Sequence, residues 1–473
     1  MREIPKFFTF HFSLFTFFRN FVVPIQIIMT HKRINLRQWV LPFLLLLCSA
    51  TSAQSIAEEI QAVPQRSAGI RYALPTGLQQ TDTPAPEGKK PFYISHYGCP
   101  AAYYLENPKD YEEPIATLAK ADSLNMLTPL GKDVLRKLRM VYDDAIYRVD
   151  ELTVKGAQQM RQLAQELVDR FPEMFTKGCV VDARSIVRNH NIMSMQEAMT
   201  QIAKNSSSTD LRIKSSHSND AWMDVRDKEL EKDRFNPETE ASYQAFRQAN
   251  SDNQRLMESL FVSADYVKAH IDPMVLSDQL FVVVGTIQST PLENVVTLYD
   301  IFTDKELYQH WRIHNAWNYI SYGHFALNGG HQAYAQRAPL WNLMHIGDSI
   351  KNLDFPVVHL RYSSRGMVLS LICLMELNGF GLQTADLDQL DKLGWADYKI
   401  APYGANVQVI HYRKDKNDED ILIKVLLNGQ ETQLPIATDC APYYHWQDAK
   451  RYYLRKLYAY EKLRYNSKQT QKK

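Results

Sequence analysis

The sequence predicts an α/β fold that is interrupted by a long helical insertion. Short strands that are apolar on both faces alternate with amphipathic helices near both ends of the chain, as in strands buried between helices. Residues 201–324 between these two parts carry charged, helical patterns. An Asn-Gly turn near the C-terminus adds a hairpin. Of the 473 residues, 45% are hydrophobic and 23% are charged, which is ordinary globular composition.

The first α/β part begins with a strand at 92–95, which runs into the sequence "ISHYGCPA" at residues 94–101. Two helices follow, and Thr128 and Thr153 are their predicted N-caps because each precedes an apolar i, i+3, i+4 pattern. "GCVVDARS" at 178–185 is predicted to be a second strand, buried on both faces.

The α/β pattern returns after the insertion. "FPVVHLRY" at 355–362 predicts a strand, and "GMVLSLICLMELNGFG" at 366–381 predicts a helix. "ANVQVIHYRK" at 405–414 is expected to pair with the strand that starts at residue 420, and Asn428-Gly429 is the turn signal. The chain should end in a basic helix.

The N-terminus predicts export. Residues 29–53 combine a basic start, an apolar run and small residues before Gln54, which is typical of a signal peptide cleaved after Ala53. We interpret residues 1–28 as upstream read-through; the alternative is a membrane anchor within 7–28. Lipidation at Cys48 is a second alternative. The mature protein should therefore be periplasmic or secreted, with a proline-rich linker or surface arm over 54–88 and no transmembrane segment.

The remaining cysteines give no redox or metal pattern. They form no C-x-x-C pair, so buried free thiols are favoured over disulfides: Cys99, Cys179, Cys373 and Cys440. His310 and His314 are four residues apart on a predicted helix but lack an evident third ligand. We expect no metal and no cofactor. The net charge of +1 argues against a nucleic-acid partner.

Several motifs resemble a known family. "LTPLGKDV", "VVDARS…NIMSMQ", "HLRYSSRG" and "DILIKVLLNGQETQLPI…APYYHW" are similar to the branch-2 histidine (acid) phosphatases. The likeness runs over about residues 91–460 and is strongest to the bacterial, Bacteroides-type multiple inositol polyphosphate phosphatase-like proteins. It implies a mixed β-sheet flanked by helices, built from residues 89–200 and 325–473, with residues 201–324 as an α-helical cap.

The family chemistry requires several groups around one phosphoryl group. A histidine attacks phosphorus, and arginines hold the equatorial oxygens on which transition-state charge develops. A second histidine adds a hydrogen-bond donor, and a neighbouring carboxylic acid protonates the leaving oxygen. The first strand end carries the motif R-H-G-x-R, and the later one carries L-R-F-G-H followed by the acid.

In the first motif, Gly98 matches the family glycine. His96 then replaces an arginine, Tyr97 replaces the nucleophilic histidine, and Pro100 replaces the second arginine. In the middle motif, His190 stands where the resemblance implies an arginine, with Arg188 nearby.

In the last motif, Arg361 matches the family arginine. Ser364 and Arg365 stand where the second histidine and the acid belong. The resemblance therefore implies that the scaffold has been kept while its chemical groups have been replaced.

No residue near these positions is an evident substitute nucleophile. A phenol such as that of Tyr97 has a pKa near 10, and His96 should leave its strand on the opposite side from Tyr97. Cys99 would need backbone donors, and Pro100 removes one. The sequence thus predicts a pseudophosphatase without intact catalytic residues; the alternative is a phosphomonoesterase with a rewired centre.

The resemblance also leaves a binding role open. Arg361 and Arg188 are candidate ligands for a phosphorylated small molecule or another anion, although internal ion pairs are the alternative. We expect Tyr97, His190 and Ser364 to lie in one concave site beneath the helical insertion.

Overall fold

The computed structural model describes residues 54–77, 82–206 and 209–471. The predicted read-through (1–28), the signal peptide (29–53) and Cys48 lie outside the described residues, so these assignments remain predictions. None of the described helices is both long and apolar enough to cross a membrane.

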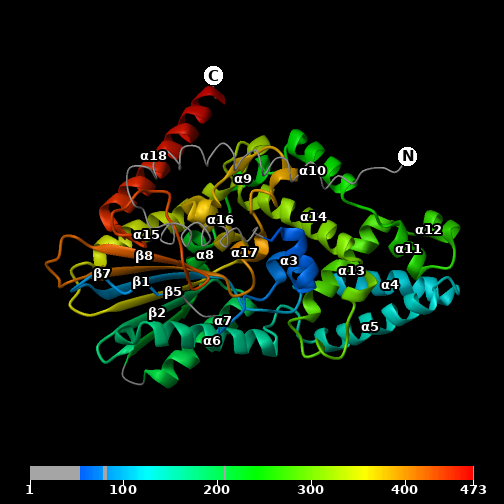
Figure 1. The fold of residues 1–473 in the computed structure, drawn as a ribbon, viewed down its shortest axis with the longest axis horizontal. Coiled ribbons are helices and arrows are strands. Elements are labelled where there is room, and N and C mark those ends of the chain that lie inside the picture. Colours follow the sequence, from blue (N-terminus) through cyan, green and yellow to red (C-terminus); the bar gives the residue numbers. More distant parts are fainter. Residues whose placement is uncertain (1–53, 78–81, 207–208, 472–473) are drawn as a thin grey trace, which may run out of the picture. The chain divides into compact units, whose positions relative to one another are not determined.

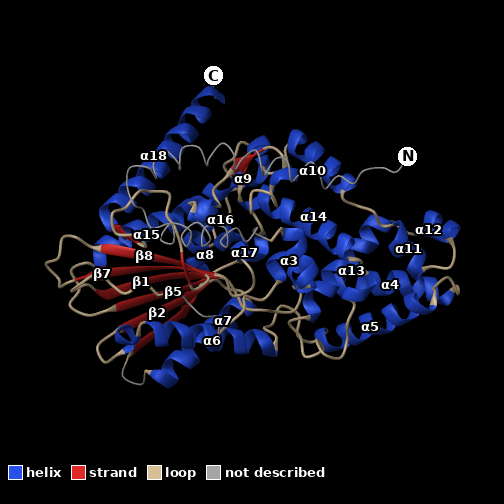
Figure 2. Ribbon diagram, in the orientation of Figure 1, coloured by secondary structure: helices blue, strands red, loops and turns tan. Residues whose placement is uncertain are grey.

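An eight-stranded mixed sheet forms the centre of the α/β part (Figures 1 and 2). The strand order is β10-β8-β7-β1-β5-β2-β3, and β9 pairs with β8. β1, β5, β2 and β3 run parallel to one another, whereas β7 pairs antiparallel with β1 and begins an antiparallel half. The strands are β1 (Lys90–Gly98), β2 (Val180–Ser185), β3 (Asp210–Ser215), β5 (Val357–Tyr362), β7 (Asn406–Arg413), β8 (Leu422–Leu427), β9 (Gln430–Glu431) and β10 (Tyr443–His445). A separate small sheet pairs β4 (His324–Phe325) with β6 (Gln383–Thr384).

Helices cover both faces of this sheet (Figure 2). One face packs on α6 (Val154–Arg170) and α7 (Asn189–Asn205). The other face packs on α15 (Arg337–Ile350), α16 (Arg365–Met375) and α18 (Trp446–Gln471). This arrangement confirms the predicted fold class. It also explains the strands that are apolar on both faces, because helices cover the sheet on both sides.

A second hydrophobic core holds a helical lobe away from the sheet (Figure 1). Helices from residues 201–324 pack into this core, and α4 (Lys109–Ser123) and α5 (Pro129–Ala145), which precede these residues, pack into it as well. The remaining helices are α3 (Ile56–Ala62), α8 (His217–Met223), α9 (Lys228–Asp233), α10 (Pro237–Ala249), α11 (Gln254–Leu260), α12 (Ala264–His270), α13 (Pro273–Ile287), α14 (Asp304–Tyr322) and α17 (Asp397–Ile400).

Local sequence signals set several boundaries. The Thr128 hydroxyl accepts a hydrogen bond from the Gly131 N–H at the start of α5, and Thr153 caps α6 in the same way. Asn428 and Gly429 both adopt positive φ, 53° and 78°, in the turn between β8 and β9, as a tight hairpin turn requires.

Two segments differ from what the sequence suggested. Residues 210–215, inside the expected helical insertion, form β3 at the sheet edge; its charged, largely exposed side chains are typical of an edge strand. The segment 54–88, expected to be a linker or arm, carries α3, whose Ile56 and Ile60 are buried.

The four described cysteines are unpaired, and three of them are buried. Cys440 is the partly exposed one.

Candidate functional site

A cavity of about 310 Å³ lies at the carboxyl ends of β2 and β5, where these strands lead into α7 and α16. Arg188 and His190 from the start of α7 line it, together with Ser364 and Arg365 from the start of α16. The helical insertion closes the opposite wall with residues 224–234. His190 and Ser364 therefore line the same cavity as residues of the insertion.

The Ser364 hydroxyl makes two structural hydrogen bonds. Its Oγ accepts a hydrogen bond from the Met367 N–H, 3.1 Å away, and so caps α16. The same hydroxyl donates to Asp224 Oδ1 at 2.6 Å. Ser364 thus serves as a helix cap that anchors the insertion through Asp224.

His190 is held by two neighbours. Its Nδ1 pairs with the carboxylate of Asp150, and its ring stacks on Tyr103 with 4.0 Å between centroids and an 8° angle between planes. Asp150 itself adopts a left-handed backbone, with φ of 67°, a conformation that Asp tolerates better than most residues. The histidine is therefore oriented by a carboxylate, although its side chain is almost fully buried.

Arg365 lies in the wall of the cavity as a partly buried cation. Its guanidinium lies over the rings of Tyr103 and Tyr403, at 5.1 and 4.9 Å, and Nη1 donates to the Ile70 carbonyl at 3.3 Å. Burial lowers the pKa of Arg365, but Tyr103, Tyr403, Glu106 and Cys99 outweigh burial and raise it overall. Arg365 therefore gives this wall of the cavity a permanent positive charge.

The cavity is electrostatically balanced. Four arginines and four carboxylates line it: Arg188, Arg226, Arg234 and Arg365, with Glu106, Asp224, Asp227 and Glu231. This balance makes the cavity less attractive to a highly charged polyphosphate than a cavity lined by arginines alone.

Two of these arginines remain available to a ligand. The ion pairs of Arg188 are long, 3.6 Å to Glu106 and 3.8 Å to Asp224. Within the described part of the chain, Arg234 forms no ion pair; its guanidinium lies 5.9 Å from the centroid of the Tyr322 ring, and its Nε is buried without a hydrogen-bond partner. Both can therefore donate to an anion without first breaking a short ion pair.

Arg361 does not line this cavity. It is 2% exposed, and its Nη1 donates to the Asp182 carbonyl at 2.8 Å and to Asp182 Oδ1 at 3.1 Å. Desolvation by burial lowers the pKa of this guanidinium. Arg361 was expected to bind a ligand. Instead it links β5 to β2 through its internal ion pair with Asp182.

The side chain of Tyr97 at the end of β1 is buried in the core and almost inaccessible to solvent. Tyr97 is 1% exposed, and its phenol donates to Asn342 Oδ1 of α15 at 3.1 Å. Burial raises the pKa of Tyr97 well above its usual range. Tyr97 does not line the cavity that holds His190 and Ser364, so the expected meeting of these three residues is not observed.

His96 projects to the other face of the sheet, as the alternation of strand side chains requires. It faces a separate cavity of about 40 Å³ beside α6, where there is room for a few water molecules. Burial lowers the pKa of His96 to about 4, and its Nδ1 has no hydrogen-bond partner within the described residues.

The turn after β1 is closed by backbone bonds. The Cys99 N–H donates to the Ala405 carbonyl at 2.9 Å, and the Pro100 carbonyl accepts from Gly404 at 2.8 Å. Burial raises the pKa of the Cys99 thiol to about 12. Neither residue lines the larger cavity, so neither supplies a reactive group to it.

The structure thus brings Arg188, His190, Ser364 and Arg365 together and leaves His96, Tyr97, Pro100 and Arg361 elsewhere. Sequence reasoning missed Asp224, Arg234 and Asp150. Asp224 and Arg234 belong to the insertion, and Asp150 lies in the loop before α6, so no local pattern linked them to the motifs.

Comparison with known proteins supports the fold. No protein-family model matches the sequence, and no curated protein sequence does. The structure of Bifidobacterium longum multiple inositol polyphosphate phosphatase with inositol hexasulfate is similar, with a TM-score of 0.67 and 14% identity over 81% of this chain and 97% of that chain. The phytase from D. castellii has a TM-score of 0.60 and 13% identity over 83% and 84% of the two chains. The chain has the histidine acid phosphatase fold, in the form that it shares with multiple inositol polyphosphate phosphatase.

Proposed function

We propose that this protein is an exported pseudophosphatase. It uses the histidine acid phosphatase fold to bind a phosphorylated or otherwise anionic small molecule in the cavity between α7 and α16, and it does not hydrolyse phosphomonoesters. Export rests on the signal-peptide pattern of residues 29–53, and it places the protein in the periplasm or outside the cell. N-terminal sequencing of native protein should find a start at or near Gln54; finding residues 1–28 attached would contradict it.

One observation carries the loss of activity: Tyr97, at the nucleophile position, lies outside the cavity and is bonded to Asn342. Ser364, a helix cap, stands at the position of the second histidine, and the partly buried Arg365 stands at the position of the acid. General acid catalysis alone is worth about 10²–10⁴-fold in rate, and one charge-stabilising donor about 10²–10³-fold. Loss of these groups together would remove essentially all of the rate enhancement.

Ligand binding is supported by the two available arginines. Arg188 and Arg234 can each donate charge-assisted hydrogen bonds to a phosphate group. Crystal structures of the similar bifidobacterial enzyme are complexes with inositol hexasulfate and with phosphate. The balancing carboxylates of this cavity favour an anion with few charges.

One observation favours a second function. The pair of His190 and Asp150 has the arrangement of an oriented base, because the carboxylate fixes the tautomer of the imidazole. A phosphomonoesterase with a rewired centre would use His190 for the chemistry.

Phosphate release and ligand binding together test these proposals. The purified protein should release no phosphate from inositol hexakisphosphate or p-nitrophenyl phosphate between acidic and neutral pH. Calorimetry should detect binding of inorganic phosphate. Arg188→Gln or Arg234→Gln should each weaken this binding about 10–100-fold, since a hydrogen bond to a charged group is worth about 1.5–3 kcal/mol. Arg212→Gln is the control, because Arg212 is paired with Asp210 on β3 outside the cavity.

Two results would contradict the proposal. Turnover that His190→Ala abolishes would establish the rewired enzyme instead. Phosphate binding that neither arginine substitution changes would remove the cavity as the ligand site.

A further inference from the structure

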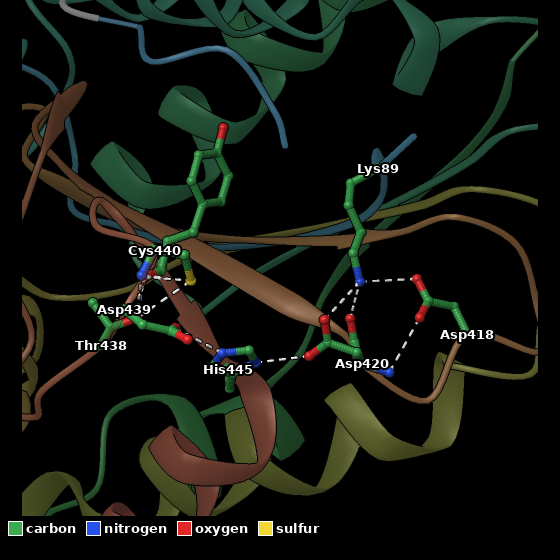
Figure 3. A network of polar contacts seen from close by, with 8 residues as sticks. Lys89, Asp418, Asp420, Thr438, Asp439, Cys440 and His445 are labelled. Carbon is green, nitrogen blue, oxygen red and sulfur yellow. Dashed lines mark hydrogen bonds and ion pairs between the residues drawn. The ribbon is translucent and has the colours of Figure 1, made fainter. Parts of the chain in front are cut away.

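A polar cluster outside this cavity has the composition of a transition-metal site. Asp439, Cys440 and His445 each offer one ligand atom, and these atoms lie within 4.8 Å of one another. They belong to the loop before β10 and to β10 itself, at the antiparallel edge of the sheet (Figure 3). The proposed function uses none of them.

His445 is oriented as a metal ligand would be. Its Nδ1 is 2.7 Å from Asp420 Oδ1, and its Nε2 is 3.0 Å from Asp439 Oδ1 (Figure 3). A carboxylate on one ring nitrogen fixes the ring and directs the other nitrogen toward the ion in metal sites of this kind. Asp420 is the carboxylate in that position.

Asp420 is itself held in place by the ammonium group of Lys89. Its Oδ2 lies 3.2 Å from the buried Nζ of Lys89, which also contacts the Asp420 carbonyl and, at 3.0 Å, Asp418. Asp420 lies two residues before the start of β8 at Leu422, and His445 of β10 pairs with Leu422 across the two strands. The orienting carboxylate, at the entrance to β8, and the histidine, on β10, are therefore held side by side.

The Cys440 thiol is positioned by its own loop. Its Sγ lies 3.3 Å from Thr438 Oγ1 and 3.4 Å from the Tyr443 carbonyl. Thr438 Oγ1 donates to the same carbonyl at 2.8 Å. The loop thus presents the sulfur beside His445 before any ion binds.

We propose that Asp439, Cys440 and His445 bind one zinc-class divalent ion, with Asp420 as the residue that positions His445. A sulfur, an imidazole nitrogen and a carboxylate oxygen suit Zn²⁺, whereas Ca²⁺ and Mg²⁺ prefer oxygen ligands alone. Tetrahedral zinc with ordinary bond lengths separates its ligand atoms by roughly 3.3–3.7 Å, so small side-chain movements would close the site. Three protein ligands leave the fourth position to water.

The ion can enter from solvent. The Asp439 and His445 side chains are 83% and 36% exposed. Binding displaces the Nε2 proton of His445, now directed at Asp439, and the thiol proton of Cys440. Zinc affinity should therefore fall as pH is lowered.

These ligands follow the spacing D-C-x₄-H, without a C-x-x-C pair, so the sequence alone does not indicate a metal site here. A second described cluster, formed by Glu106, Asp150 and His190, also meets the distance requirement. It has no sulfur ligand, so it serves as the competing location in the test.

Calorimetry with Zn²⁺ alone on chelator-treated full-length protein tests the proposal, together with the absorption spectrum of the Co²⁺-substituted protein. We expect one equivalent of zinc and a thiolate-to-cobalt charge-transfer band. Cys440→Ser and His445→Gln should each abolish both signals. Asp420→Asn should keep the charge-transfer band and lower the affinity for zinc about tenfold, as the loss of an orienting carboxylate does.

Two further variants separate this site from adventitious binding. His217→Gln removes an exposed histidine whose Nδ1 lies 3.1 Å from Asp220 Oδ2, and this change should leave zinc binding unchanged. His190→Gln should also leave zinc binding intact. Binding without a charge-transfer band, binding that survives Cys440→Ser, binding lost in His190→Gln, or no binding would each overturn the proposal.

Discussion

The carboxyl ends of β1 and β5 are neighbours in the sheet, where Gly98 pairs with Tyr362, yet their surroundings are opposite. At the β1 end, Tyr97 and Cys99 are about 1% exposed and belong to the core. At the β5 end, Ser364 and Arg365 border an open cavity. The end of β1 is thus part of the core, while the end of β5 borders a cavity lined by charged side chains.

This difference separates two kinds of consequence. Substitutions at the β1 end should act on the stability of the fold, because the side chains there are packed. Substitutions around the cavity should act mainly on ligand binding.

The largest effect should come from Tyr97→Ala. Removing a fully buried aromatic ring should lower the free energy of unfolding by about 3–5 kcal/mol, through lost burial and the cavity left behind. Urea denaturation followed by circular dichroism measures it. Tyr147→Ala is the control: Tyr147 is 90% exposed, and the change should stay within about 0.5 kcal/mol. A loss below about 1 kcal/mol for Tyr97→Ala would show that the β1 end is not sealed.

A somewhat smaller loss of stability should come from the protonation of His96 at low pH. Burial lowers the pKa of His96 to about 4 in the folded state, against about 6.5 in the unfolded state. Between these values the unfolded state binds the extra proton, so stability is complete above pH 6.5 and falls as pH drops toward 4. At about 1.4 kcal/mol per pKa unit, this histidine contributes roughly 3 kcal/mol to that fall.

Unfolding free energies of the wild type and of His96→Asn, compared at pH 7 and pH 4.5, measure this contribution. The difference between the two pH values should be smaller in the variant by about 2–3 kcal/mol. His310 and His411, whose pKa values burial lowers to about 4 and about 3, should leave a remaining acid sensitivity in both proteins. His217→Asn, at an exposed site, should reproduce the wild-type profile; an unchanged profile in His96→Asn would contradict the burial of His96.

The parts of the fold that local signals encode were predictable. The caps at Thr128 and Thr153 and the Asn428-Gly429 turn are each set by a few adjacent residues, and all three are observed. Strand β3 was missed because its charged edge-strand sequence resembles a polar loop. The membership of α4 and α5 in the helical lobe depends on packing partners more than 100 residues away, and amphipathic spacing does not identify a partner.

The candidate site was predictable only in part. The resemblance indicated which residues differ from the family motifs. Strand alternation placed the side chains of His96 and Tyr97 on opposite faces of the sheet. The pairing of Arg361 with Asp182, and the arrival of Asp224 and Arg234 from the insertion, depend on tertiary contacts. Charge balance in a cavity cannot be calculated until those contacts are known.

The smallest effect should come from Ser364→Ala at the cavity border. The variant loses the N-cap of α16 and the bond to Asp224, so the free energy of unfolding should fall by about 1 kcal/mol, the usual cost of removing a cap. Ser364→Thr keeps a capping hydroxyl and should stay within about 0.5 kcal/mol of the wild type in the same urea titration. Equal losses in the two variants would show that steric fit, rather than the hydroxyl, sets the contribution of this position. A loss as large as that of Tyr97→Ala would contradict the contrast between the packed end of β1 and the open end of β5.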